Sequence, residues 1–397
     1  MKPVAHAPAE AGAFRFIAIL AAVSALGPFS IDMYLPAMPA MAEALDASSS
    51  LLQLTVTGYL TGVAVGPLVL GPLADAWGRL RAQTLFLLLY AALSLACALA
   101  PSAEALILFR IAQAVAAGAA MTSTRAMLSD VFEGDALSRA TSLMMMIFTM
   151  GPVLAPLIGA GLLGLVGWRG IFGALVVFSL IACLLMRRLP ETLPPDRRRP
   201  YAARAVIAEY LAIMRHPAAR RYLASTFCFA FWFFALLAAS PFIFIRHFGM
   251  SPQGFGWLFA LISTAALIGN ILNARIVFRF GYERMLSGAT FALGLLGVVT
   301  LAVALSGIGG LWGIFAVMLG LMAVFHVSTA NTLAGMMGIA GPRAGAAAAV
   351  SGASSFCTAS SVASTGICGA SGAAAGEGAA TGTEAVVGAG AAGDPVV

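Results

Sequence analysis

The sequence predicts an all-α protein that crosses a membrane many times, and three observations support this fold class. Hydrophobic residues make up 61% of the 397 positions and charged residues only 10%, whereas a soluble domain carries roughly a quarter charged residues. The mean hydropathy is +0.96. Apolar runs of about 18 to 24 residues recur along the chain, and each is long enough to cross a bilayer as a helix.

The expected spans can be placed in order from these apolar runs. The first follows a basic start, as in a signal peptide, but its apolar run continues to Pro36, which is too long for a signal sequence, so we expect it to be retained. An eleventh candidate span starts near Arg343. The ten spans before it are expected at 14–36, 51–73, 82–100, 104–127, 141–163, 168–187, 222–245, 254–274, 286–306 and 309–333.

The basic residues predict the orientation of these spans. Of the 22 basic side chains only Lys2 is a lysine. With the N-terminus inside, the outer loops hold only Arg169 and Arg246, Arg110 lies within a span, and all other basic residues fall on the inner side. Such a bias places the N-terminus and the linker in the cytoplasm. The net charge of +6 therefore reflects topology, and we expect no nucleic-acid partner.

The chain divides into two sets of spans around an arginine- and proline-rich segment. This pattern is typical of transporters built from repeated halves. A short surface helix is expected near 202–214. The predicted units are a cytoplasmic N-terminus (1–13), an N-terminal six-helix half (14–187), a cytoplasmic linker (188–221), an incomplete C-terminal half (222–355) and a Gly/Ala-rich tail (356–397).

The last part of the chain departs from this pattern. From Gly341 to Val397 there is no Leu, Met, Trp, Tyr or Lys. Glycine-rich sequence forms poor helix, and Glu377, Glu384 and Asp394 oppose insertion. We therefore expect the last one or two helices to be aberrant or missing. A reading-frame change or truncation near 355–358 is our hypothesis, which translation of the other frames of the coding DNA tests.

Asp32 is the only acidic residue that we place inside the membrane. A carboxylate costs several kcal/mol there, so such a residue marks an ion or substrate path. At 1.5 Å per residue, Asp32 lies roughly 27 Å along the first span and Arg110 roughly 9 Å from the outer end of the fourth. Both lie in the outer half of the bilayer, and buried opposite charges should meet.

Two interpretations of this pair remain. In the first, Asp32 is a protonation switch, because burial favours its neutral form and Arg110 favours its charged form. In the second, Asp32 and Arg110 form a permanent structural ion pair.

Four motifs resemble the major facilitator superfamily, and within it the drug:proton antiporters of the bicyclomycin/chloramphenicol resistance (Bcr/CflA) group. The resemblance covers residues 14 to about 355. The group's first-span motif is matched by Asp32, Met33, Tyr34, Leu35 and Pro36. The superfamily's loop motif is matched by Gly71, Leu73, Asp75, Gly78 and Arg79, although Ala76 and Leu80 replace the usual basic residues. The buried-arginine motif is matched by Arg110, Gln113 and Gly118, and the antiporter motif by Gly151, Pro152, Ala155, Pro156 and Gly159.

The resemblance implies two six-helix halves with pseudo-two-fold symmetry. It also implies a monomer in the bacterial inner membrane that exports small amphipathic drugs in exchange for protons and underlies antibiotic resistance. Asp32, Arg110, Gln113 and Tyr34 would couple protons and substrate. Because Ser24 stands where some relatives carry a second membrane acid, one proton per cycle is expected. A metabolite exporter, an importer or a truncated inactive transporter remain alternatives, since fold does not fix substrate.

The two other motifs have expected mechanical roles. Gly71 and Gly78 would allow a tight turn. Asp75 would accept bonds from a helix N-terminus, and Arg79 would pair across the loop as a conformational latch. Alternatively, Asp75 and Arg79 only orient the loop. Pro152 and Pro156 would bend their helix, since each removes a backbone hydrogen bond.

Other function classes lack their motifs. With Lys2 the only lysine there is no GxxxxGK[ST] phosphate loop, and no HExxH or paired membrane acids occur. We therefore expect no enzyme, no metal and no cofactor, with the proton gradient as the energy source. No motif excludes a channel, but the two halves favour a transporter with alternating access. The aromatic run from Phe227 to Phe234 could bind substrate or face lipid, and His326 is a candidate second titrating site.

Overall fold

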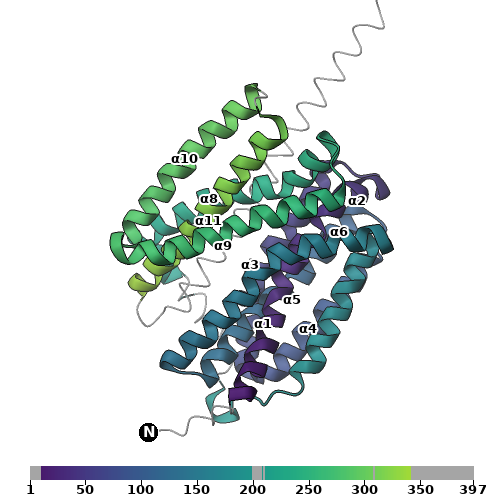
Figure 1. Ribbon diagram of the computed structural model, residues 1–397. Helices are drawn as coiled ribbons and strands as arrows, with labels where there is room; N and C mark the ends of the chain where they lie inside the picture. The colour runs from purple at the N-terminus through teal and green to yellow at the C-terminus, as the bar shows by residue number, and fades with distance from the viewer. Residues whose placement is uncertain (1–9, 199–207, 209–210, 307–308, 341–397) are drawn as a thin grey trace, which may run out of the picture.

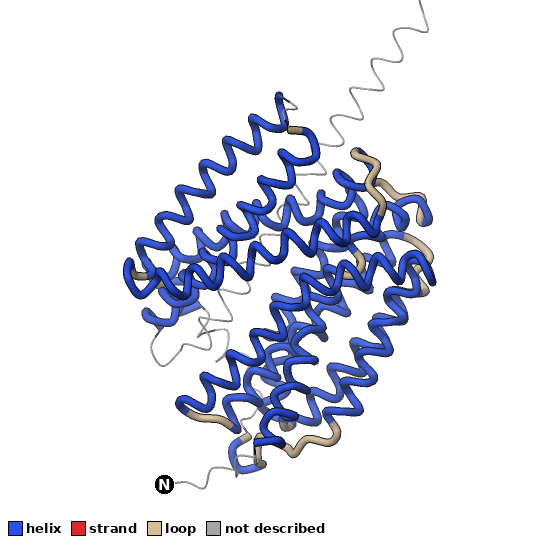
Figure 2. Tube along the Cα trace, in the orientation of Figure 1, coloured by secondary structure: helices blue, strands red, loops and turns tan. Residues whose placement is uncertain are grey.

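Every regular element in the described part of the protein is a helix, as the sequence predicts. The computed structural model describes residues 10–198, 208, 211–306 and 309–340. Figure 2 shows these residues as helices joined by short loops. The all-α membrane fold class is therefore confirmed.

Thirteen helical elements follow one another along this part of the chain. The first set comprises α1 (Glu10–Asp32), the 3-10 helix η1 (Leu35–Ala37), α2 (Met38–Ala44), α3 (Ser49–Trp77), α4 (Arg79–Ala98), α5 (Ala103–Val131) and α6 (Gly134–Met186). The second set comprises the 3-10 helix η2 (Pro195–Arg197), α8 (Pro217–Pro241), the π-helix η3 (Phe242–His247), α9 (Pro252–Phe280), α10 (Tyr282–Ser306) and α11 (Gly310–Ala340).

The predicted spans all coincide with these helices, with one difference. Nine helices of the described residues are long and apolar enough to cross a membrane. The expected spans 141–163 and 168–187 lie together in α6, whose backbone leaves the helical conformation only at Gly167, where φ is 71°. Glycine adopts this conformation without steric cost, so the two spans join without a loop. Residues 208 and 211–214 of the predicted surface helix are helical. The rest of that helix and the expected eleventh span lie outside the described residues.

Figure 1 shows two helical bundles, one made of α1 and α3–α6 and the other of α8–α11. The two bundles repeat the same local signals. Helices α3 and α9 each contain 29 residues. Each begins after a capping serine, Ser48 or Ser251, whose side chain accepts a backbone N–H. Each ends at a glycine with positive φ, Gly78 or Gly281, after which the next helix starts.

Small residues bring α3 and α5 close together, and this packing positions the site. A side-chain carbon at Gly62 of α3 would lie only 2.6 Å from the Cβ of Ala114 of α5. Such small residues let membrane helices approach closely. Tyr59 lies one turn before Gly62 and Arg110 one turn before Ala114, so the tight crossing brings these two side chains together.

Candidate functional site

The site lies where α1 ends. The following segment is the 3-10 helix η1, and Pro36 and Pro39 have no N–H to continue the α-helical ladder. The last carbonyl groups of a helix have no intrahelical donor. Ser30 belongs to this last turn, so its carbonyl oxygen is free to accept a bond from another helix.

Arg110 of α5 donates a hydrogen bond to this carbonyl. Its guanidinium is fully buried and donates to the Ser30 carbonyl at 2.8 Å and to Oε1 of Gln113 at 2.8 Å. The guanidinium carbon also lies 4.4 Å from the ring centre of Tyr34 and 4.1 Å from that of Tyr59. Aromatic faces attract such a cation. Arg110 is therefore held by a helix C-terminus, an amide and two rings.

Asp32 is buried at the end of α1 and forms no ion pair with any residue that the structure describes. Its side chain is 6% exposed. Within the described residues the ion pairs join Arg79 to Asp75 and to Asp130, and Asp32 takes part in none. The expected direct pair of Asp32 with Arg110 is therefore wrong, and the guanidinium bonds Ser30 and Gln113 instead. Tyr34, two residues after Asp32, is the neighbour in the chain that contacts the guanidinium.

Tyr34 and Gln113 complete the coupling cluster, by which we mean Asp32, Tyr34, Arg110 and Gln113. The hydroxyl of Tyr34 lies 3.0 Å from that of Thr55 on α3, which in turn donates to the Leu52 carbonyl. Arg110 thus contacts both Tyr34 and Gln113, while Asp32 lies two residues before Tyr34 in the chain. Sequence reasoning missed Tyr59 and Ser30. The position of Tyr59 within an apolar span was the signal that could have identified it.

Ser24 occupies the position of the second acid found in some relatives. Its hydroxyl is buried and lies 2.8 Å from that of Thr124 on α5. The same hydroxyl lies 3.8 Å from the sulfur of Met144 on α6. This hydroxyl pair carries no charge. Asp32 is accordingly the only acid among the buried side chains that the structure describes.

The loop motif between α3 and α4 differs in part from its predicted geometry. Gly78 makes the turn, with φ at 102°, but Gly71 lies inside α3 with open space around its α-carbon. The tight-turn role predicted for Gly71 is therefore wrong. Arg79 pairs across the loop as expected, at 2.5 Å to Asp75 and 3.2 Å to Asp130 of α5.

An acidic residue of the linker accepts hydrogen bonds from the N-terminus of α4, a role that the sequence analysis assigns to Asp75. Glu191 accepts the backbone N–H of Arg79 at 2.8 Å and that of Leu80 at 3.2 Å, at the first turn of α4. A carboxylate at a helix N-terminus meets unpaired N–H groups and the positive end of the helix dipole. Thr192 donates to Asp130 at 3.2 Å. These bonds join α3, α4, α5 and the linker, and sequence reasoning missed Glu191 and Asp130.

The antiporter motif lies on α6, facing α1 on one side and α9 on the other. A side-chain carbon added at Gly151 would lie only 2.9 Å from the Cβ of Pro28. One added at Gly159 would clash with the Met33 carbonyl. Both contacts flank Asp32 on α1. The backbone stays helical through Pro152 and Pro156, so the bend at the prolines stays a prediction.

Pro156 has no N–H, so the carbonyl of Pro152 loses its intrahelical donor. Ser263 of α9 donates to this carbonyl at 3.0 Å, while also lying 2.9 Å from its own Phe259 carbonyl. The contact joins the two bundles.

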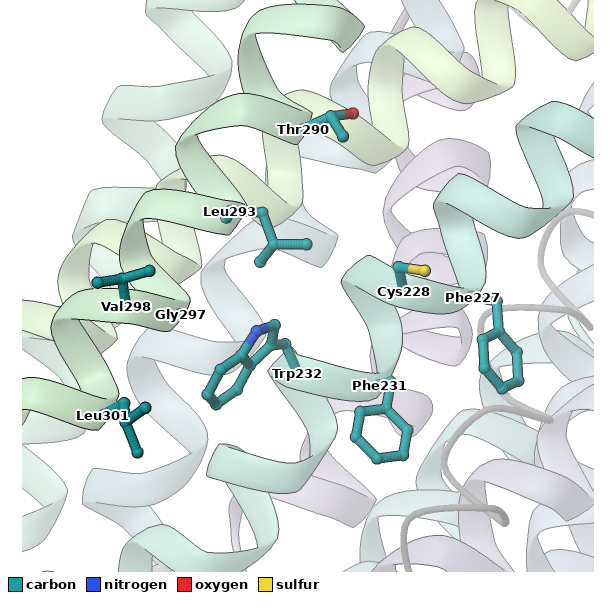
Figure 3. A pocket seen from close by; sticks show the side chains of 10 residues that line it. Phe227, Cys228, Phe231, Trp232, Thr290, Leu293, Gly297, Val298 and Leu301 are labelled. Carbon is teal, nitrogen blue, oxygen red and sulfur yellow. The ribbon is translucent and has the colours of Figure 1, made fainter. Parts of the chain in front are cut away.

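The aromatic run of α8 separates into two groups. Phe233 stacks on Phe325 of α11 with 4.1 Å between ring centres, and the His326 ring contacts both. Other members line a cavity of about 680 Å³ between α8 and α10. Figure 3 shows Phe227, Phe231 and Trp232 of α8 lining this cavity, with Leu293, Val298 and Leu301 of α10 opposite. No lining residue of this cavity belongs to the coupling cluster.

Two asparagines of the second bundle pair between helices, as expected for polar groups inside a membrane. Asn331 of α11 donates to Asn273 of α9 at 2.7 Å. His326 instead lies 2.9 Å, through Nδ1, from the Met322 carbonyl of its own helix.

Comparisons with known proteins agree with these motifs. The sequence model of the Major Facilitator Superfamily matches residues 20–366. An uncharacterised MFS-type transporter, YdgK of Bacillus subtilis (strain 168), is 34% identical over 68% of both chains. A "Bicyclomycin resistance protein homolog" of Haemophilus influenzae is 30% identical over 74% of both chains. A "Chloramphenicol resistance protein" of Pseudomonas aeruginosa is 30% identical over 72% of this chain and 68% of its own.

Solved structures share the fold at low sequence identity. The xylose transporter XylE of E. coli, in a partially occluded inward-open conformation, superimposes with a TM-score of 0.70 at 15% identity over 89% of this chain and 90% of its own. An inward-facing bacterial homologue of the human lysosomal transporter Spinster gives 0.68 at 16% identity, over 87% and 80% of the two chains.

Proposed function

Because this chain belongs to the major facilitator superfamily, we propose that it is a secondary transporter that exports small amphipathic drugs in exchange for protons. Relatives named for bicyclomycin and chloramphenicol resistance support this substrate class. The proton gradient drives transport, and the protein lies in the bacterial inner membrane as a monomer with its N-terminus in the cytoplasm. Two halves, 14–187 and 222–355, act around the linker 188–221.

The observation that carries the proposal is the unpaired, buried carboxyl group of Asp32. A carboxyl group in an apolar site favours its neutral form, and a nearby cation favours the charged form. Arg110 contacts Tyr34, two residues beyond Asp32, and is bonded to Ser30 and Gln113. Asp32 can thus take up and lose a proton without breaking an ion pair. Binding of an amphipathic drug beside it would expel that proton.

Proton release on substrate binding tests the proposal. Chloramphenicol is added to the detergent-solubilised protein in weakly buffered solution, and the pH change is recorded. We expect release of about one proton per chain from the native protein and none from Asp32→Asn. Asp46→Asn is the matched control, because Asp46 is exposed at a turn with φ of 46° that asparagine accepts.

The outcomes separate the competing functions. Drug binding without proton release in the native protein would reject antiport and favour a facilitator or importer on the same fold. Release that persists in Asp32→Asn would remove Asp32 from the mechanism. The absence of binding would favour an inactive transporter, and the same measurement on a chain with a family-like C-terminal end would follow.

A further inference from the structure

The cavity of about 680 Å³ between α8 and α10 has a counterpart in the first bundle. The capping serines Ser48 and Ser251 of α3 and α9 are 203 positions apart. The glycines that end the same two helices, Gly78 and Gly281, are separated by the same number of positions. In chain order, α8 to α11 therefore correspond to α1, α3, α4 and α5. The cavity between α8 and α10 thus corresponds to the space between α1 and α4.

In the first bundle this space is filled by the second arm of α6, by which we mean residues 168–186. Phe178 of this arm stacks on Phe29 of α1 with 5.8 Å between ring centres. On the other side, Ser179 donates a hydrogen bond to the Leu87 carbonyl of α4 at 2.8 Å. The second arm therefore lies in the groove between α1 and α4 and contacts both helices.

The corresponding face of α10 has no such cover in the part of the chain that the structure describes. Thr290 and Gly294 line the cavity and are exposed. Their counterparts in α4, 203 positions earlier, are Leu87 and Ala91, and both are buried. The groove between α8 and α10 is therefore open where its counterpart is filled.

The chain's own counterpart of the second arm is a poor occupant for this groove. By the same register it is residues 371–389, which lie outside the described residues. This stretch contains Glu377 and Glu384 and no Leu, Ile, Met or aromatic residue. Acidic side chains oppose insertion into lipid, whereas the groove is lined by large apolar side chains such as Phe231 and Trp232. An apolar group from the surrounding membrane suits this lining better.

One end of the groove is bordered by an arginine from each helix. Arg221 of α8 and Arg284 of α10 are both exposed. Tyr222 and Tyr282, one and two positions from these arginines, lie close together, so the two cations border the same end. Glu283 also lies there, but among the described residues no ion pair joins it to either arginine. This end of the groove can therefore attract an anion.

The spacing between these arginines and the cavity suits a phospholipid. Phe227 lies six residues after Arg221, and Thr290 lies six residues after Arg284. At the helical rise, the cavity begins roughly 9 Å along each helix from its arginine. A phosphate at the arginines would thus place an acyl chain in the cavity, within the roughly 15 Å depth of one leaflet. Basic pockets between membrane helices bind anionic lipid headgroups in this manner.

We propose that the groove between α8 and α10 binds an anionic phospholipid, whose phosphate contacts Arg221 and Arg284 and whose acyl chain fills the cavity. The lipid occupies the place that the second arm of α6 has in the first bundle. With the proposed orientation, the arginine end of the groove lies in the cytoplasmic leaflet. The two cations favour an anionic headgroup over a zwitterionic one.

Quenching of Trp232 by brominated lipids tests this site, because Trp232 lines the cavity and bromine on an acyl chain quenches a tryptophan that it contacts. The test chain carries four substitutions that leave Trp232 as its only tryptophan, Trp77→Phe, Trp168→Phe, Trp257→Phe and Trp312→Phe. It is reconstituted in phosphatidylcholine vesicles with a rising fraction of brominated phosphatidylglycerol or brominated phosphatidylcholine. We expect phosphatidylglycerol to bind roughly fivefold more tightly or better, the effect of one nearby arginine or more.

Neutral side chains at the arginine end should abolish this preference. In the double variant Arg221→Gln with Arg284→Gln, the ratio of the two lipid affinities should fall close to one. Arg81→Gln is the matched control, because Arg81 is the exposed counterpart of Arg284 in α4, where the second arm of α6 fills the groove. This variant should keep the native ratio.

A larger side chain inside the groove should exclude the acyl chain. Gly294 lines the cavity and has nothing within 4 Å of an added side-chain carbon. Gly294→Leu should therefore fold and weaken the quenching of Trp232 by both lipids. Gly288→Leu is the matched control, because Gly288 also has open space on α10 but does not line the cavity.

The other outcomes would overturn the proposal. Equal affinities for the two lipids in the unsubstituted groove would remove the role of the arginines. Quenching that appears only after removal of residues 371–397 would identify that tail as the occupant, and quenching that falls as the protein-to-lipid ratio rises would identify a second copy. If the chain with Trp232 alone does not fold, thermal stabilisation of the native chain by phosphatidylglycerol, compared between Gly294→Leu and Gly288→Leu, decides. These measurements use no drug and no proton, so they stand apart from the proposed function.

Discussion

Ser263 of α9 donates a hydrogen bond across the two bundles to the carbonyl of Pro152 on α6, at 3.0 Å. This carbonyl is free because Pro156, four residues later, has no N–H. The antiporter motif therefore creates an unpaired acceptor on one bundle, and a serine of the other bundle uses it. The bond exists only while α6 and α9 keep this relative position, so it favours the conformation described above.

Removal of the Ser263 hydroxyl should shift the conformational equilibrium. A neutral hydrogen bond contributes about 1 kcal/mol, so Ser263→Ala should reduce the population of this conformation roughly fivefold. Nη1 of Arg246 lies 3.2 Å from Oγ of Ser49 across the bundles. Cysteines introduced at these two positions in a cysteine-free chain report the population by their rate of cross-linking with a bifunctional thiol reagent. Ser225→Ala is the control, because Ser225 bonds only its own helix. An unchanged rate in Ser263→Ala would contradict this role.

Neutralisation of Glu191 should loosen the linker from the loop motif. Glu191→Gln removes the negative charge from the first turn of α4, a change that costs about 0.3–1 kcal/mol at a helix N-terminus. We expect faster tryptic cleavage within 188–221 and a lower melting temperature. Glu133→Gln serves as the control, because Glu133 precedes α6 without a capping hydrogen bond. Equal cleavage rates in the two variants would contradict this role of Glu191.

A side chain at Gly159 should disrupt the packing of α6 on α1. An added carbon has no room beside the Met33 carbonyl, and such overpacking costs about 1–3 kcal/mol or more. Gly159→Ala should therefore lower the melting temperature in detergent and reduce drug transport. Gly161→Ala, on the same helix with nothing within 4 Å, is the matched control. Comparable melting temperatures in the two variants would show that α6 can move away from α1.

The two glycines of the loop motif should respond in opposite directions. Gly78→Ala places a side chain at φ of 102° and 2.7 Å from Oε2 of Glu191, which strains the backbone and displaces the linker. Gly71→Ala fills open space inside α3 and should stabilise that helix by about 0.5–1 kcal/mol. Thermal unfolding of the two variants checks the prediction, and a destabilised Gly71→Ala would restore a turn role for Gly71.

Local patterns were sufficient for the helices. The expected depths of Asp32 and Arg110 needed only span limits and the helical rise, and the structure places Arg110 against Tyr34 and Gln113. Their bonding was not predictable in the same way. A depth along a helix says nothing of its rotation or of which acceptors other helices leave free.

The carboxyl end of α1 illustrates this limit. The expectation that Arg110 would pair with Asp32 used charge alone, whereas the guanidinium bonds the Ser30 carbonyl and Gln113. Similarly, the acid at the start of α4 is Glu191 of the linker and not Asp75 of the adjacent loop. Both corrections involve residues far apart in the sequence.

The sequence by itself determined that this protein is helical, that it lies in a membrane and where its spans run. These properties follow from hydrophobic length and from the cost of a charge in lipid, which are local to each segment. Only the tertiary structure decided the partners: Ser30 for Arg110, Glu191 for α4 and Ser263 for Pro152. Hydrogen bonds depend on ångström-scale distance and direction, which arise only when helices from distant parts of the chain pack together.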